Sequence, residues 1–145
     1  MPEDKPQHIL FLCVENSARS QMAEGLARSL APVGVRISSA GSQPTRLRPD
    51  AVLTMKEIGI DISHQHAKSI SEIETDSVDL VVTLCADQIC PLFPGSPSQI
   101  HWELPDPAAE QGDDGARVEA FRNVRDDLSR RIELLFGTSD QAATI

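Results

Sequence analysis

Short apolar runs alternate along the chain with segments of helical character, and this alternation predicts an α/β fold. The apolar runs predict strands at residues 8–12, 35–40, 78–84 and 100–103. Periodicity and helix-end signals predict helices at residues 20–30, 49–58 and 118–136, with a short helical piece at 71–74. Pro49 at the start of the second helix and Gly59 after its end are typical of helix boundaries.

Strand–helix alternation implies a parallel, four-stranded sheet with helices on both faces. The chain of 145 residues has room for one domain, which we place at residues 1–137, and residues 138–145 are expected to be a frayed tail. Ligands of such sheets bind beyond the carboxyl ends of the strands. Cys13 and Cys85 both stand at such ends, so the fold could bring them together.

The bulk composition excludes several classes of partner. A formal net charge of −9 with no basic stripe argues against nucleic acid. No run approaches the roughly 18 apolar residues of a membrane-spanning helix, and the polar start is unlike a signal peptide. We therefore expect a cytoplasmic protein that contacts neither membrane nor nucleic acid. We take it to be a monomer, although nothing in the sequence determines the oligomeric state. The odd number of cysteines, three, argues against a structural disulfide framework.

The stretch from Cys13 to Ser20 carries the most specific chemistry. It lies between a predicted strand and a predicted helix, so backbone N–H groups and the positive end of a helix dipole point at one place. A tetrahedral oxyanion could bind there, held by the planar guanidinium of Arg19. The same field favours a thiolate at Cys13. The anion-binding loop comprises Val14, Glu15, Asn16, Ser17, Ala18 and Arg19.

Other interpretations of the cysteines stay open at this point. A cysteine that ends a buried strand can be an inert apolar residue, although the placement of Cys13 and Arg19 between strand and helix favours a nucleophile. Cys85 and Cys90 could form half of a metal site. The spacing of the histidines matches no zinc template, so we expect no metal.

Six segments together resemble one known family. They are CVENSARSQMAEG (13–25), SSAGSQPTRLRPDAV (38–52), EIGIDIS (57–63), DLVVTLCADQICP (79–91), HWELPDP (101–107) and FRNVRDDL (121–128). The chain resembles the thioredoxin-coupled arsenate reductases, which share the low-molecular-weight tyrosine phosphatase fold. QMAEG after the loop and the later cysteine pair distinguish these reductases from plain phosphatases. The resemblance implies reduction of arsenate to arsenite, as in arsenic detoxification.

The resemblance also implies a role for each residue of the first chemical step. Cys13 would attack the arsenic of bound arsenate, while Arg19 and the loop amides stabilise its charge. Asp106 would be the general acid for the leaving oxygen, although an aspartate before proline can also be a turn residue. Ser20 would donate a hydrogen bond to the Cys13 thiolate. Phosphate and sulfate would compete with arsenate for the loop.

A thiol relay completes the implied mechanism. Cys85 would attack Cys13, arsenite would leave, and Cys90 would then resolve the bond to give a Cys85–Cys90 disulfide. The implied electron donor is reduced thioredoxin, because an intramolecular disulfide suits a dithiol reductant. Glutaredoxin or a small thiol are the other donors that the sequence leaves open. No bound cofactor is implied.

The chain departs from the family pattern in ways that affect the site. Glu15 replaces a common glycine, and must point outward if the loop is to bind anions well. Ala18 replaces a cysteine outside the relay, and only four residues separate Cys85 from Cys90. Some relatives bind potassium through Asn, Glu, Ser and Asp. The matching positions here are Asn16, Glu24, Ser39 and Lys68. Our hypothesis is that the lysine ammonium takes the cation's place, so that no potassium is needed.

Two other functions remain as alternatives. A low-molecular-weight protein tyrosine phosphatase would use Cys13, Arg19 and Asp106 through a phosphocysteine intermediate, without the later cysteines. A non-catalytic oxyanion-binding module would keep the fold without turnover, and Glu15 is the residue that favours it. Loss of arsenate turnover on substitution of Cys85 would separate the reductase from the phosphatase.

Overall fold

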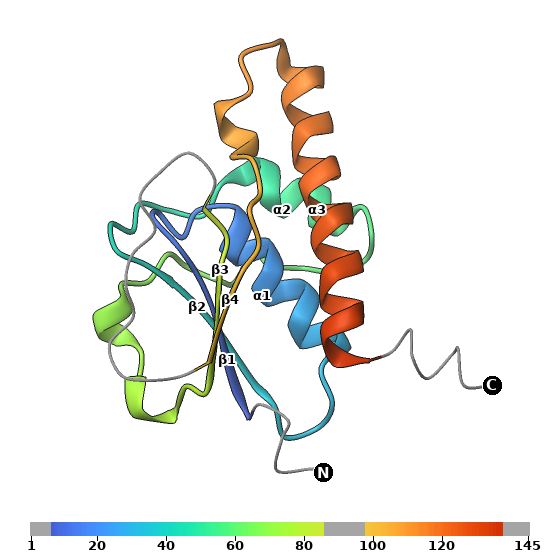
Figure 1. The fold of residues 1–145 in the computed structure, drawn as a ribbon. Coiled ribbons are helices and arrows are strands. Elements are labelled where there is room, and N and C mark those ends of the chain that lie inside the picture. Colours follow the sequence, from blue (N-terminus) through green and yellow to red (C-terminus); the bar gives the residue numbers. More distant parts are fainter. Residues whose placement is uncertain (1–6, 86–97, 138–145) are drawn as a thin grey trace, which may run out of the picture.

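The computed structural model describes residues 7–85 and 98–137 of the chain. Within these ranges the strands form a four-stranded sheet in the order β2-β1-β3-β4, with parallel pairing throughout (Figure 1). The strands are β1 (His8–Cys13), β2 (Arg36–Gly41), β3 (Leu80–Thr83) and β4 (Ser98–His101). The predicted parallel sheet is confirmed. Each of the four strands begins and ends within two residues of its predicted boundaries.

The continuous apolar runs occupy the middle of the sheet. Every residue of β1 and β3 is buried, because each has a neighbouring strand on both sides and packing on both faces. The edge strand β4 is largely exposed. The other edge strand, β2, is exposed at Arg36 and becomes buried toward Gly41. The most buried part of β2 is therefore the end beside the loop that follows β1.

The strand register brings the predicted functional ends together. Cys13 at the end of β1 is paired with Gly41 at the end of β2. Leu12 is paired with Thr83 of β3, and the Leu84 N–H donates to the Leu12 carbonyl at 3.0 Å. Cys85, the next residue, therefore leaves the sheet at the same edge as Cys13.

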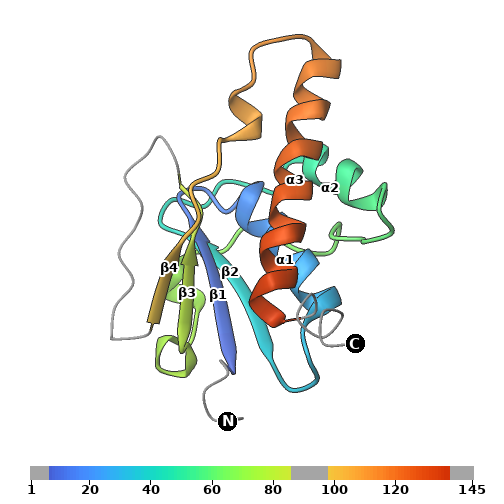
Figure 2. The ribbon, with the colours of Figure 1, turned by 45° about the vertical axis from the view of Figure 1, so that its right-hand side comes forward.

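Helices lie on both faces of the sheet, but they are of different kinds. In the described part of the chain the α-helices are α1 (Arg19–Leu30), α2 (Pro49–Lys56) and α3 (Asp114–Phe136). They pack together on one side (Figure 2). Two short 3-10 helices, Ile70–Glu72 and Thr75–Ser77, lie on the other side (Figure 1). A third 3-10 helix, Pro107–Ala109, precedes α3.

Alternate residues of β1 contribute to two separate cores, since successive side chains of a strand point to opposite faces. Ile9 and Phe11 belong to the larger core, which includes side chains of α1, α2 and α3. Leu10 and Leu12 belong to a smaller core, against which Ile70 of the first 3-10 helix packs. The helix α2 is also tied to α3 by charge. A hydrogen bond from Arg122, assisted by Arg125, lowers the pKa of Glu57 to about 2.

The helix α3 begins earlier than the apolar periodicity predicted. It starts at Asp114 rather than 118, and the Asp113 carboxylate caps it by accepting the Ala116 N–H at 2.9 Å. The first turn, residues 114–117, has no large apolar side chain, so the apolar periodicity does not reveal it. The helix ends at Phe136 as predicted, where Gly137 adopts a left-handed φ of 75°. No helix in the described ranges is both long and apolar enough to cross a membrane.

Gly25 lies where α1 packs most closely on its neighbours. A Cβ at this position would lie 2.5 Å from Cγ2 of the buried Ile62 and 3.3 Å from Cε of Met55. We expect Gly25→Ala to lower the free energy of unfolding by about 1–3 kcal/mol, because overpacking outweighs the gain in helix propensity. Urea unfolding would measure the change.

Gly115→Ala in α3 is the matched control for this substitution. Its Cβ would meet only Asp113 Oδ1 at an ordinary 3.5 Å, so stability should stay the same or rise by up to about 1 kcal/mol. A Gly25→Ala protein as stable as the wild type would contradict the close packing of α1 against Ile62.

Candidate functional site

The loop of residues 14–18 joins β1 to the N-terminus of α1 and forms a cradle of backbone groups. The carbonyls of Val14, Glu15 and Ser17 accept N–H groups from residues 43, 45 and 48, at 2.8, 3.1 and 2.9 Å. The loop thus turns carbonyls toward the segment that follows β2. No described group accepts a hydrogen bond from the N–H groups of residues 15–18. Such a run of N–H groups at a helix N-terminus is suited to an anion.

The thiol of Cys13 lies at the base of this loop. Its side chain is buried, with a free sulfur 2.9 Å from Ser20 Oγ. Asn16 Nδ2 donates to the same Ser20 oxygen at 2.7 Å. Asn16 itself has a φ of 52°, a left-handed conformation that residues other than glycine seldom adopt. The structure thus brings the Cys13 sulfur and the Ser20 hydroxyl into contact, as the sequence led us to expect.

Arg19 is buried beneath the loop and connects it to two distant segments. Its Nη1 donates to the carbonyl of Leu84 at 3.2 Å and to the carbonyl of Leu104 at 3.0 Å. The first carbonyl directly precedes Cys85, and the second lies two residues before Asp106. The guanidinium therefore positions the candidate general-acid segment and the second cysteine relative to the first.

Asp106 directly precedes the 3-10 helix Pro107–Ala109 and is half-buried. Its Oδ1 accepts the Ala108 N–H at 3.0 Å, so it is a capping residue as well as a candidate acid. Asp106 also lines a hollow of about 500 Å³ between this segment and α3. Glu110, Asn123 and Asp127 line the same hollow.

Cys85, the second cysteine of the predicted relay, follows β3 beside the end of β1. Cys85 is buried and takes part in a disulfide bond, whereas Cys13 has a free thiol. Cys90, the predicted resolving residue, lies outside the described residues. The expected tail at 138–145 lies outside them too.

The departures from the family pattern are accommodated. Glu15 is exposed and accepts a hydrogen bond from Thr45 Oγ1 at 3.2 Å. Its carboxylate is thus held by the segment after β2, as anion binding would require. Ala18 is 3% exposed and packs in the larger core.

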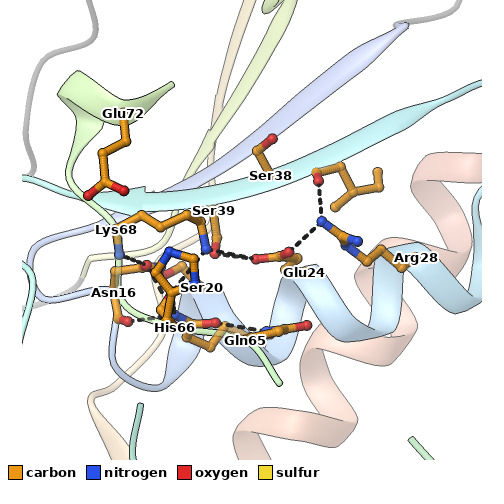
Figure 3. Close-up of polar contacts among 12 residues, drawn as sticks. Asn16, Ser20, Glu24, Arg28, Ser38, Ser39, Gln65, His66, Lys68 and Glu72 are labelled. Atoms are coloured by element: carbon orange, nitrogen blue, oxygen red, sulfur yellow. Dashed lines mark hydrogen bonds and ion pairs between the residues drawn. The ribbon is translucent and has the colours of Figure 1, made fainter. Parts of the chain in front are cut away.

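The four residues of the expected cation-site remnant do come together (Figure 3). The buried Glu24 carboxylate accepts a hydrogen bond from Ser39 Oγ at 2.6 Å and is paired with Arg28 at 2.7 Å. Lys68 Nζ lies 3.6 Å from the Glu24 carboxylate. The Lys68 backbone N–H donates to Asn16 Oδ1 at 2.8 Å. An ammonium therefore lies beside Glu24, as the hypothesis of a built-in cation requires.

Sequence reasoning missed three residues that support the loop. A Cβ on Gly41 would lie 2.4 Å from the Val14 carbonyl oxygen, so only glycine lets β2 end against the loop. Gln21 donates to the loop residue Asn16, and Gln65 in turn donates to Gln21. The available signals were Gln21 at the start of QMAEG and Gly41 within SSAGSQPTRLRPDAV, since both segments carry the family resemblance. In residues 7–85 and 98–137, no three His, Cys, Asp or Glu side chains gather as a metal site would require.

The chain matches the family model "Low molecular weight phosphotyrosine protein phosphatase" over residues 8–143. It is 43% identical to an arsenate reductase of Halalkalibacterium halodurans over 127 residues, which cover 86% of this chain and 91% of that protein. It is 36% identical to a glutaredoxin arsenate reductase of Synechocystis over 88% of this chain and 94% of that protein.

Solved structures agree with these relatives. An arsenate reductase in the phosphate binding state superimposes with a TM-score of 0.77 at 35% identity, covering 91% of this chain and 98% of that one. A thioredoxin-dependent arsenate reductase of Corynebacterium glutamicum has a TM-score of 0.60 at 28% identity, covering 90% of this chain and 63% of that one. With its cysteine–arginine loop at the edge of a parallel sheet, this chain belongs to the low molecular weight phosphotyrosine protein phosphatase family and, within it, to the arsenate reductases.

Proposed function

We propose that this protein reduces arsenate to arsenite, with Cys13 as nucleophile and Cys85 and Cys90 as the relay. The observation that carries the proposal is the position of the free Cys13 thiol. It lies between a helix N-terminus and the strand end that leads to Cys85. A phosphatase needs a thiol at a helix N-terminus, but it does not need a second cysteine at the neighbouring strand end.

Arsenate binding would rest on the loop rather than on long-range attraction. The chain as a whole repels anions, since its formal net charge is −9, and salt screens such repulsion beyond roughly 8–10 Å. The N–H groups of residues 15–18 and the Arg19 guanidinium would hold the arsenate oxygens. Phosphate and sulfate have the same tetrahedral shape and would compete. The solved structure of an arsenate reductase in the phosphate binding state supports this.

The first chemical step forms a sulfur–arsenic bond and breaks an arsenic–oxygen bond. The Cys13 thiolate would attack arsenic, and Asp106 would give a proton to the departing oxygen, which leaves as water. Arg19 supports this assignment, because its contact with the Leu104 carbonyl connects the Asp106 segment to the loop.

The second step reduces arsenic. The Cys85 thiolate would attack the Cys13 sulfur, a sulfur–sulfur bond would form, and the sulfur–arsenic electron pair would stay on arsenic, which leaves as arsenite. Cys90 would then attack the Cys85 sulfur and release Cys13. The disulfide at Cys85 and the free thiol at Cys13 match the state expected after such a turnover.

The disulfide would be reduced by an external dithiol, for which we propose thioredoxin. A dithiol supplies both electrons in one encounter, and the Corynebacterium relative is described as thioredoxin-dependent. The Synechocystis relative is described as a glutaredoxin arsenate reductase, so glutaredoxin is the donor to compare. We propose that the protein acts as a cytoplasmic monomer without a bound cofactor.

Substitution of Cys85 separates the reductase from the phosphatase. We expect Cys85→Ser to abolish multiple turnover, measured as arsenate-dependent NADPH consumption with thioredoxin and thioredoxin reductase. Any hydrolysis of p-nitrophenyl phosphate should persist, because it needs Cys13, Arg19 and Asp106 only. Cys13→Ser is the control that should lose both. Sustained arsenate turnover by Cys85→Ser would refute the relay.

Activity should not depend on potassium, because the Lys68 ammonium already lies beside the buried Glu24 carboxylate. Arsenate reduction should proceed equally in potassium and sodium chloride at constant ionic strength. In Lys68→Ala, which lacks the ammonium, the rate should differ more between potassium and sodium chloride. A several-fold stimulation of the unaltered protein by potassium would show that the ammonium does not replace a free cation.

A further inference from the structure

The side-chain amide of Asn16 has one orientation that satisfies its neighbours. Its Oδ1 lies 2.8 Å from the backbone nitrogen of Lys68, and a backbone N–H can only donate, so the facing atom must be oxygen. Nδ2 therefore faces Ser20 and donates to Oγ at 2.7 Å (Figure 3). The Ser20 oxygen is an acceptor in this bond.

Gln21 is fully buried in the first turn of α1, and its amide is oriented by the same logic. Its Nε2 lies 2.9 Å from the Asn16 carbonyl and 2.8 Å from the His66 carbonyl. Both carbonyls can only accept, so this atom must be nitrogen. It also donates to Asn16 Oδ1 at 3.0 Å. One amide thus joins the anion-binding loop to the segment 65–68.

Gln65 continues the chain of donors outward. Its Nε2 lies 3.1 Å from the backbone carbonyl of Gln21 and 2.7 Å from Gln21 Oε1, and it donates to both. The hydrogen bonds therefore run in one direction, from Gln65 to Gln21, from Gln21 to Asn16, and from Asn16 to Ser20. Backbone groups determine this direction at each amide.

The direction of the chain determines what Ser20 does to the thiol. Among the described residues, the side chain of Ser20 has two partners, Asn16 Nδ2 and the Cys13 sulfur at 2.9 Å. Because Asn16 donates to Ser20, the hydroxyl hydrogen is left for the sulfur. A hydrogen bond donated to sulfur stabilises the thiolate over the thiol.

We propose that Gln21 is a positioning residue for Cys13, with Gln65 as its outer support. Gln21 holds Asn16 in its left-handed conformation, φ 52°, and so keeps Ser20 as the donor to the sulfur. Without the Gln21 amide, the Asn16 carbonyl and Oδ1 lose a donor, and the loop relaxes away from Ser20. This inference deepens the proposed function, because the same thiol is the nucleophile there.

The test measures the reactivity of Cys13 in the reduced, full-length protein. Iodoacetamide forms a thioether at Cys13 as iodide leaves, and mass spectrometry of the Cys13 peptide gives the rate from about pH 5 to pH 9. In Gln21→Met, which keeps the length but loses the donor, the midpoint of this profile should rise by about one pH unit. That corresponds to roughly tenfold slower reaction on the acidic side.

Thr54→Val is the matched control. Thr54 is also fully buried, and its hydroxyl donates to the Asp50 carbonyl at 2.9 Å in α2, with no contact to Asn16. This variant should lose stability and keep the wild-type profile. If Gln21→Met lowers the melting temperature as Thr54→Val does and leaves the profile unmoved, Gln21 is merely structural and the proposal is overturned.

Gln65→Leu keeps the proposal testable if Gln21→Met fails to fold. Gln65 is half-buried in a loop, so its loss should be tolerated, and its profile should move in the same direction by a smaller amount. An unmoved profile in this variant would overturn the proposal as well. Alkylation of Cys13 needs neither arsenate nor an electron donor. The pH profile therefore tests the role of Gln21 even if the protein turns out not to reduce arsenate.

Discussion

The buried guanidinium of Arg19 connects the three segments on which the site depends. It donates to the carbonyls of Leu84 and Leu104, which lie 65 and 85 positions further along the chain. A buried cation that donates to carbonyls is stable only where those acceptors are fixed in place. The end of β3 and the Asp106 segment are therefore held relative to the loop after β1, before any substrate binds.

The loop itself is held from both of its sides. The segment 43–48 binds its carbonyls, while Gln21 and the Lys68 N–H hold the amide of Asn16. The left-handed Asn16 would otherwise relax, since this conformation costs of order 1–3 kcal/mol. The strain is thus maintained by surrounding contacts, which is how a loop can present several N–H groups to one point. Gly41 allows β2 to approach closely enough to contribute.

An acidic protein that binds an anion must concentrate its positive groups locally. Here the loop N–H groups and Arg19 lie at the carboxyl edge of the sheet, and Glu15 is held at the surface by Thr45. Glu24 is the one carboxylate of the described residues that is buried near the loop. Arg28, Lys68 and Ser39 surround it, so its charge is compensated and does not oppose that of a bound oxyanion.

The sequence by itself determined the features that depend on residues close together in the chain. The apolar runs and the Cys13-to-Ser20 stretch between a strand and a helix are local patterns, and the structure has them within two residues of the predicted positions. The start of α3 was predicted four residues too late, because its first turn has no apolar periodicity. Asp106 and Cys85 could be assigned roles only through family resemblance, because neither has a local signature. Other contacts involve residues far apart in the sequence. They are the bonds from Arg19 to two carbonyls, the bond that holds Glu15 at the surface, and the amide bridge through Gln21 and Gln65. Only the strand register and the packing of the loops decided these contacts, since a hydrogen bond depends on distance and direction in space.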